Sequence, residues 1–331
     1  MRGERENQGR AGGGSAIRDG GVTRVLVGHP GNLLGCADMR PAAAIALALP
    51  LLCGCPSVAP PPSQLPDATA AIDRMRATTA NCLGVQASAK IDHFGKQGRV
   101  RGELELIAVV PAKMRMDVIS PFGVALATLT SDAKDFALAD LRDKRFYVGP
   151  ASACNIARLT TVPIPGSVLV NLLRGEAPVL RHEGRTPAIT WSPRGYYVVS
   201  IAGTRDATEE VHLTPRPEDW GKAWNAQRMR VLDVEVKQQG IVLYHAELKG
   251  HAAAPMSRER VDPDGIDPPI PPSGPFCDAE IPRSIHVEVP GLDEDVLFRY
   301  DQVTWNPPLP EGVFTQEPRP GLQTFPVTCT E

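Results

Sequence analysis

Polar and apolar residues alternate along most of the chain beyond residue 100. The runs GELEL at 102–106 and KMRMDV at 113–118 show the period of two that is typical of a half-buried antiparallel strand. Similar runs recur at 123–131, 134–140, 143–149, 187–192, 194–202, 207–214, 228–237, 240–249, 281–289 and 294–305. Turn sequences such as SPRG at 192–195 separate neighbouring runs, as in hairpins. The pattern predicts a meander of about a dozen strands.

Two segments have helical spacing instead. Residues 67–82 place Ile72, Met75 and Thr79 on one face, and a second apolar face recurs between Pro165 and Gly175. A long sheet with only two helices must bury one face beneath them. We therefore expect a mainly β (α+β) domain over residues 67–331, in which a curved antiparallel sheet of about 11–12 strands is covered by short helices.

Residues 250–280 interrupt this pattern and are rich in proline. We expect a surface excursion there. Its aspartates at 262, 264 and 267 lack the spacing and the closing glutamate of an EF-hand loop, so a solvated turn is expected. The chain also has no CxxC pair or spaced histidine pair typical of zinc, and we predict no metal site.

An apolar run, AAAIALALPLL, occupies residues 42–52. It is shorter than the roughly 20 residues that cross a bilayer, but it suits the core of a signal peptide that starts at Met39. We expect residues 39–54 to be that signal peptide. Residues 1–38 are glycine-rich and aperiodic, so they are expected to be disordered or to lie upstream of the true start. Two alternatives stay open: an ordinary cleaved signal peptide and a chance apolar run.

The run ends in LCGC at 52–55, which resembles the bacterial lipobox. On that resemblance Cys55 becomes the acylated N-terminal residue, and no cofactor is expected other than these acyl chains. Each buried methylene contributes about 0.8 kcal/mol, so a multiply acylated cysteine anchors a protein durably. Residues 55–66 would then form the lipidated cysteine and a proline-rich tether.

Four further cysteines follow the proposed anchor, at positions 82, 154, 277 and 329. An even number in an exported protein indicates disulfides, and three pairings are open. One of them joins Cys277 to Cys329 and Cys82 to Cys154; four free thiols are the alternative. The net charge of −3 and the absence of a long basic run exclude the electrostatic signature of a nucleic-acid-binding protein.

Catalytic motifs are absent from the sequence: it has no GxSxG, HExxH, Walker or GxGxxG pattern. The histidines are dispersed, and His212, His245 and His286 alternate with apolar neighbours, so they are expected on the outward face of the sheet. We expect a protein that is not an enzyme. A triad assembled from residues distant in sequence stays open.

Three stretches resemble the LolB and LolA-like family of lipoprotein-sorting proteins: MRMDVISPFG at 114–123, TVPIPGSVLVNLLRG at 161–175 and WNPPLPEGVF at 305–314. The resemblance implies a half-barrel closed by helices over a hydrophobic cavity. It also implies a protein on the periplasmic face of the outer membrane that binds acyl chains and receives or inserts acylated lipoproteins. Its partners would be lipoprotein cargo or lipid, a periplasmic LolA-type carrier and the membrane.

Candidate site residues follow from the pattern and the resemblance together. Apolar strand residues expected to line the acyl cavity are Met114, Met116, Val118, Leu126, Leu232, Val234 and Val236. The lid is expected at Ile164, Val168, Leu169 and Leu172. Phe122, in the turn PFG, would contact the membrane, unless it folds back over the sheet edge.

The alternative that the same strand residues form a filled β core stays open. The alternative function is accordingly a structural or protein-interaction lipoprotein that keeps the fold with a filled cavity. A membrane-tethered enzyme is the third hypothesis.

Overall fold

The computed structural model describes residues 57–96 and 98–329. The expected signal peptide at 39–54, the upstream segment and the proposed lipidation site Cys55 lie outside these residues. Within the described residues, no helix combines the length and the apolar character needed to cross a membrane.

Most of the described chain is β structure, with three α-helices: α1 (Ala68–Thr79), α2 (Ala153–Thr160) and α3 (Gly166–Leu173). Two 3₁₀ helices are η1 (Pro217–Asp219) and η2 (Trp224–Ala226). The strands are β1 (Gly84–Gly95), β2 (Gly98–Val109), β3 (Lys113–Ile119), β4 (Ala125–Asp132), β5 (Asp135–Asp140), β6 (Arg145–Pro150), β7 (Ala188–Ser192), β8 (Tyr196–Ala202), β9 (Ala207–Pro215), β10 (Met229–Gln238), β11 (Ile241–Lys249), β12 (Ala252–Ala253), β13 (Glu280–Ile281), β14 (Ser284–Val289), β15 (Glu294–Trp305) and β16 (Gln323–Pro326).

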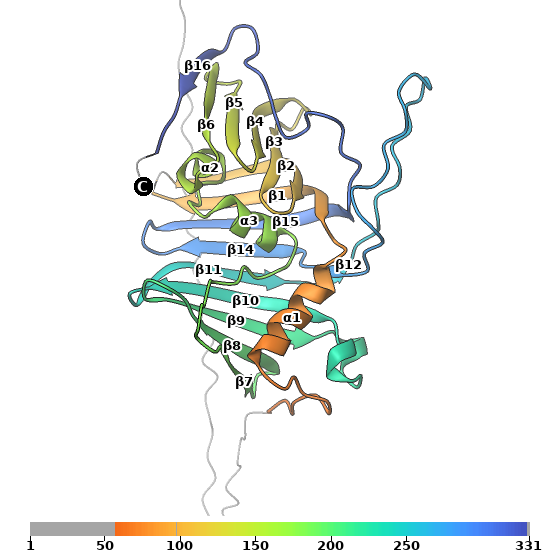
Figure 1. Cartoon of the computed structure of the whole chain (residues 1–331). Helices are drawn as coiled ribbons and strands as arrows, with labels where there is room; N and C mark the ends of the chain where they lie inside the picture. Colours follow the sequence, from red (N-terminus) through yellow and green to blue (C-terminus); the bar gives the residue numbers. More distant parts are fainter. Residues whose placement is uncertain (1–56, 97, 330–331) are drawn as a thin grey trace, which may run out of the picture. The chain divides into compact units, whose positions relative to one another are not determined.

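Fourteen of the strands form one open, curled sheet in the order β16-β6-β5-β4-β3-β2-β1-β15-β14-β11-β10-β9-β8-β7. Two meanders, β1–β6 and β7–β11, meet in the middle because β15 pairs with β1 and β14 pairs with β11 (Figure 1). The pairs are antiparallel except for β16, which lies parallel to β6. The predicted mainly β class with an open, curled sheet is thus observed.

Three elements escape the sequence pattern. Strand β1 turns Val85, Ala87 and Ala89 inward, and alanine gives a weak hydrophobic signal even though all three side chains are buried. Strand β16 has only four residues, and α2 has only two turns. Each of these elements is too short or too weakly apolar to be identified from the periodicity of the sequence.

The helices cover one face of the sheet, which Figure 1 shows. Helix α1 packs on β8 and β10, α2 on β5, and α3 on β2 and β3. Asp67 caps α1 by accepting a hydrogen bond from the backbone N–H of Ala70 at 2.8 Å. Helix α3 ends as the sequence predicts, because Gly175 adopts a φ of +78° and an added Cβ there would lie 2.5 Å from Cδ of Pro282.

The proline-rich segment expected as a free tether is instead attached to the sheet in its described part. Val58 donates its N–H to the carbonyl of Pro193 and accepts a hydrogen bond from Nε1 of Trp191, both at 2.9 Å. Further along, Leu65 is buried and its N–H donates to the hydroxyl of Tyr197. The backbone N–H groups of Val58 and Leu65 donate to the β7–β8 hairpin, and the Leu65 side chain is buried. Residues 57–66 therefore belong to the folded unit.

The 250–280 excursion is closed at its base by the short β12–β13 pair. At its far end Asp262 accepts hydrogen bonds from the N–H groups of Ile266 and Asp267, at 2.8 and 3.0 Å. This is the turn expected from the sequence, with the Asp262 carboxylate satisfied by the backbone.

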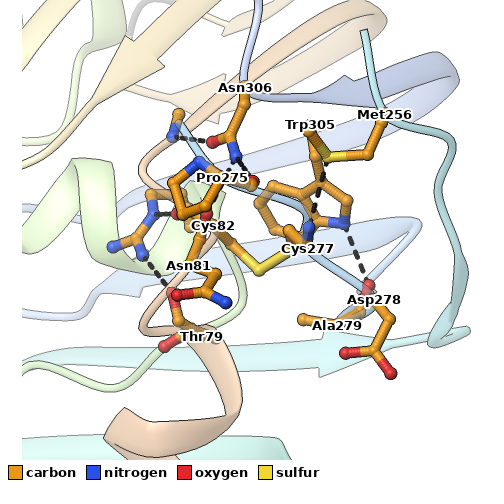
Figure 2. The surroundings of a disulfide bond; sticks show 12 residues. Thr79, Asn81, Cys82, Met256, Pro275, Cys277, Asp278, Ala279, Trp305 and Asn306 are labelled. Atoms are coloured by element: carbon orange, nitrogen blue, oxygen red, sulfur yellow. Dashed lines mark hydrogen bonds between the residues drawn. A yellow bond between two sulfur atoms is a disulfide. The ribbon is translucent and has the colours of Figure 1, made fainter. Parts of the chain in front are cut away.

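Two disulfides join Cys82 to Cys277 and Cys154 to Cys329. The pairing considered from the sequence, Cys277 with Cys329 and Cys82 with Cys154, is therefore wrong. Figure 2 shows the reason at the first bridge: the excursion folds back beside the end of α1, where Trp305 donates its Nε1–H to the carbonyl of Ala279 at 2.9 Å. The second bridge attaches the C-terminal tail to α2.

Candidate functional site

A groove of about 800 Å³ opens between α3 and the sheet, on the helix-covered face. Its walls come from four places: the segment that leads into α3 and the helix itself, residues 178–181, the start of β11 with the end of β10, and the turn after β14. We call it the α3 groove. Its lining residues are Arg76, Pro163, Ile164, Pro165, Ser167, Val168, Asn171, Pro178, Val179, Leu180, Arg181, Val236, Ile241, Val242, Leu243, Tyr244, Val289, Gly291 and Leu292.

The walls of the α3 groove are mostly apolar and partly open to solvent. Ile241 is 65% exposed, Leu243 43% and Leu292 42%. Such side chains at a concave site gain free energy when an apolar ligand covers them, at about 25 cal/mol per Å². The groove can therefore hold an apolar chain that enters from solvent.

The polar groups of the groove are few and lie at defined places. Arg76 on α1 and Arg181 in the 178–181 segment are both exposed at its border. Within the wall, the carboxylate Oε2 of Glu209 on β9 accepts the N–H of Leu180 at 2.7 Å. This bond attaches the 178–181 segment to the sheet.

Glu209 is an unusual group for such a position. It is only 2% exposed, and its second oxygen, Oε1, has no hydrogen-bond partner among the described residues. Burial raises the pKa of Glu209 to about 7, against the opposing effects of the Leu180 N–H and the charge of Arg76. Burial also raises the pKa of Tyr244, and the neighbouring Glu209 adds to that shift.

The C-terminal end of α3 is held firmly. Arg174, which follows the helix and is 3% exposed, donates to the carbonyls of Cys82 and Thr79 at 2.7 and 3.2 Å. The hydroxyl of Tyr300 donates to the carbonyl of Leu173 at 2.8 Å. Ser167 and Val168 border the groove at the opposite end of the helix, and Asn171 borders it closer to the held end.

The expected lid residues divide between two environments. Ile164 and Val168 line the α3 groove. Leu169 and Leu172 are 2% and 0% exposed and pack in the core beneath the helix. Amphipathic spacing identified the helix correctly. The most apolar face of α3 packs on the core, and the groove lies along the side of the helix.

The expected cavity wall is largely core. Met114, Met116 and Val234 are at most 1% exposed and belong to the main hydrophobic cluster. Helix α3 packs on β3, which carries the two methionines, and α1 packs on β10, which carries Val234. Of the seven predicted wall residues only Val236 borders the α3 groove. Met114 and Met116 therefore pack in the core, and neither borders the α3 groove.

Two predicted wall residues lie at irregularities in the sheet. Leu232 is the extra residue between Val231 and Asp233, where the pairing of β10 with β9 shifts, and buried Val231 takes the expected inward place. A bulge reverses the alternation on which an inward assignment depends.

Leu126 and Val118 border a different hollow. Leu126 is 41% exposed and lies beside the shift in the pairing of β3 with β4. With Val118, Ile119 and Leu297 it lines a hollow of about 510 Å³. Leu297 alternates with the buried Val296 and Phe298, so this hollow opens on the outward face of the sheet. The assignment of Leu126 to an inward cavity wall is wrong.

Phe122 is 93% exposed at the tip of the turn between β3 and β4. Val124 in the same turn is 60% exposed, and Gly123 there has a φ of +77°. The alternative that Phe122 folds back over the sheet edge does not hold. Two large apolar side chains at one protruding turn make an exposed apolar tip.

The residues of the groove that sequence reasoning missed are those of 178–181 and 241–244. The segment APVL at 177–180 is short and proline-containing, and it reads as a loop. The start of β11, IVLY at 241–244, is apolar on both faces, which the period-two reading does not single out as a binding surface. An unbroken apolar run at a hairpin end was the available signal.

Comparison with known proteins gives matches among solved structures only: no family model matches the chain, and no curated protein does. A LolA superfamily protein from Nitrosomonas europaea is 11% identical, with a TM-score of 0.43, over 76% of this chain and 98% of that one. A DUF1329 family protein from Desulfovibrio piger is 8% identical, with a TM-score of 0.44, over 75% and 96% of the two chains.

A domain from Vibrio parahaemolyticus, named for outer membrane lipoprotein sorting, is 12% identical, with a TM-score of 0.39, over 75% of this chain and 95% of that one. All three TM-scores are below 0.5, and these likenesses assign no ligand or partner to this chain. The chain is similar, at low identity, to one protein named for the LolA superfamily and to one domain named for outer membrane lipoprotein sorting.

Proposed function

We propose that the chain is a non-catalytic lipoprotein that binds acyl chains in the α3 groove and takes part in the reception or insertion of lipoproteins at the outer membrane. In this proposal acylated Cys55 anchors it on the periplasmic face, and the curled sheet serves as the half-barrel that the sequence resemblance implies. The observation that carries the proposal is the apolar groove of about 800 Å³ beside α3.

The size and chemistry of the groove support an acyl ligand. Small-molecule sites commonly measure about 300–1,000 Å³ and are lined mainly by apolar side chains. Ile241, Leu243 and Leu292 supply such walls without being packed against one another as a core. Because each buried methylene contributes about 0.8 kcal/mol, a fatty chain gains more there than any ligand of similar length with polar groups.

The border of the groove suits an anionic head group. Arg76 and Arg181 are both exposed beside the apolar walls. Arginine binds phosphate and carboxylate through two parallel hydrogen bonds. A phospholipid or an acylated lipoprotein held against lipid would place its chains in the groove and its charge at these side chains.

Movement of α3 would admit and release the ligand. Its C-terminal end is held by Arg174 and by Tyr300, whereas Pro163, Ile164 and Pro165 border the groove at the start of the helix. An outward tilt of residues 163–168 would therefore widen the groove while the far end stays in place. Handoff from a periplasmic LolA-type carrier would use this opening.

Phe122 would contact the bilayer in the final step. Its turn projects from the sheet with Val124, and Lys90, Arg101 and Arg299 line the neighbouring hollow. Because Asp92 and Glu103 line the same hollow, it is the apolar tip itself that favours a membrane surface.

Titration of the purified full chain with a fluorescent fatty acid tests the groove. The variants Ile241→Glu and Leu243→Glu place a charge on the wall at positions that are exposed enough to leave the fold intact. Val100→Glu is the matched control, because Val100 on β2 is 59% exposed and does not border the groove. We expect saturable binding that both groove variants weaken by at least about tenfold, the effect of roughly 1.4 kcal/mol, and that Val100→Glu leaves unchanged.

A second function has a specific observation in its favour. Met114 and Met116 of the expected cavity wall pack in the main hydrophobic cluster, and the excursion exposes Val261, Ile266 and Phe276. A lipoprotein that acts as a docking scaffold would need no ligand volume and would use such side chains. Absence of fatty-acid binding by the unmodified chain would favour this scaffold over the carrier.

A further inference from the structure

Histidines and carboxylates form a continuous row on the outward face of the sheet. The row crosses β9, β10, β11, β14 and β15 and consists of His212, His245 and His286 with Glu210, Asp233, Glu247, Glu288 and Asp295. We call it the histidine row. Its members are half-buried or exposed, and they alternate along each strand with core residues such as Val287 and Val296.

Strand register brings three of these residues together at one end of the row. Glu288 on β14 stands directly opposite Asp295 on β15, and His286 lies two residues before Glu288 on the same face. Nε2 of His286 lies 2.6 Å from Oδ1 of Asp295, and its Nδ1 lies 3.7 Å from Oε1 of Glu288. One donor atom from each of the three residues lies within 4.8 Å of the other two.

We propose that His286, Glu288 and Asp295 bind a divalent transition-metal ion such as Zn²⁺. Histidine nitrogen and carboxylate oxygen are ligands that Zn²⁺ takes at about 2.0–2.2 Å, which places donor atoms somewhat more than 3 Å apart around the ion. The three side chains project from adjacent strands of a sheet that fixes their backbones. Rotation of the side chains alone closes the remaining separation.

A fourth ligand is within reach. Glu247 on β11 pairs in register with His286, and its Oε2 lies 3.9 Å from Nδ1 of that histidine. Three protein ligands with a water, or four with Glu247, both satisfy the four-coordinate preference of zinc. On the other side Glu288 and Asp295 border a hollow of about 520 Å³, through which an ion can enter from solvent.

Charge at this end of the row favours a cation. The hollow is also lined by Asp293 and Glu294, so four carboxylates surround it. Among the described ion pairs, Glu288 and Asp295 have only histidine partners. Of the four candidate ligands, only Glu247 pairs with a lysine, Lys249 at 2.6 Å. Like charges held together in this way repel each other, and a bound divalent ion relieves that repulsion.

Isothermal titration of the metal-free full chain with ZnCl₂ tests the site. We expect one Zn²⁺ per chain and weaker binding of Ca²⁺, which prefers more oxygen ligands. His286→Gln and Asp295→Asn each remove one of three ligands. Each should weaken Zn²⁺ binding more than the 10–100-fold typical of outer-shell changes.

His212→Gln is the matched control because His212 has the same chemistry at the opposite end of the row, with Glu210 and Asp233 as neighbours. It should bind Zn²⁺ as the unmodified chain does. Circular dichroism of each variant verifies the fold, and the half-buried positions of His286 and Asp295 permit both changes. Absence of Zn²⁺ binding, equal binding by folded His286→Gln, or a loss confined to His212→Gln would each overturn the proposal.

Discussion

Arg174 donates its Nε–H to the carbonyl oxygen of Cys82 at 2.7 Å and thereby joins the end of α3 to the end of α1. The same guanidinium reaches the carbonyl of Thr79 and the carboxylate of Glu176. Carbonyls at the C-terminus of a helix lack partners within the helix, and a buried arginine supplies several donors at once. Helices α1 and α3, two of the three that cover the sheet, are therefore held together at one point, beside the Cys82–Cys277 bridge.

Replacement of Arg174 by alanine should destabilise the fold strongly. It leaves the carbonyl of Cys82 without its described partner, and it removes one of two donors from the Thr79 carbonyl and from the Glu176 carboxylate, in a site where Arg174 itself is only 3% exposed. Breaking a buried charged pair typically costs about 3–5 kcal/mol. Urea denaturation would measure this, with Arg142→Ala as the control because the Arg142 side chain is 82% exposed. A loss no larger than that of the control would contradict the role given to Arg174.

The two disulfides should differ in their contribution to the free energy of unfolding, even though they close loops of similar length, 195 and 175 residues. Removal of a native disulfide typically costs about 2–5 kcal/mol, and chain entropy predicts nearly the same contribution from either loop. Cys82 and Cys277 are buried, at 1% and 3% exposure, whereas Cys154 and Cys329 are half-buried. Because truncation of buried sulfur also leaves a cavity, the double alanine variant at 82 and 277 should be the less stable of the two. Thermal unfolding of both variants compares them directly, and equal losses would show that burial adds nothing.

Glu209 should make the protein less stable as the pH rises through neutrality. Its pKa in the folded chain is about 7, above the ordinary value of 4.5, so the folded state holds the proton more tightly than the unfolded state does. The unfolding free energy contributed by this group is fully present below pH 4.5 and is lost between about pH 4.5 and 7, by roughly 3 kcal/mol.

The variant Glu209→Gln isolates this effect, because its amide oxygen can still accept the Leu180 N–H. The difference in unfolding free energy between variant and unmodified chain should grow in favour of the variant from pH 4.5 to 7.5. A constant difference across this range would refute the raised pKa.

Phe122→Glu should weaken attachment to anionic vesicles without affecting the fold. Phe122 is 93% exposed, so the unfolding free energy should change by no more than about 0.5 kcal/mol. Burial of a phenylalanine side chain contributes about 1.5–3 kcal/mol, which is the expected loss in partitioning. Vesicle sedimentation of full chains produced without acylation would measure it, and Val100→Glu is the control with a similarly exposed apolar residue. Unchanged sedimentation of Phe122→Glu would remove the membrane role.

The histidine row illustrates a feature that the sequence pattern could not supply. Alternation correctly places His212, His245 and His286 on the outward face, but it does not say that β14 returns beside β11. Only that return sets Glu247 opposite His286, across an excursion of more than thirty residues. Pairing between strands distant in sequence depends on which apolar faces meet, and this information is spread over the whole sheet.

Local periodicity by itself determined the mainly β class, most strand positions, and helices α1 and α3, because side-chain direction in a strand or helix repeats over a few residues. Tertiary structure decided the rest. It set the strand order that joins two meanders, the pairing of the four cysteines, the packing of Met114 and Met116 into the core and the position of the α3 groove. Whether a cavity remains depends on the side chains of all the elements that surround it. In addition, a bulge at Leu232 is enough to reverse which side chains face inward.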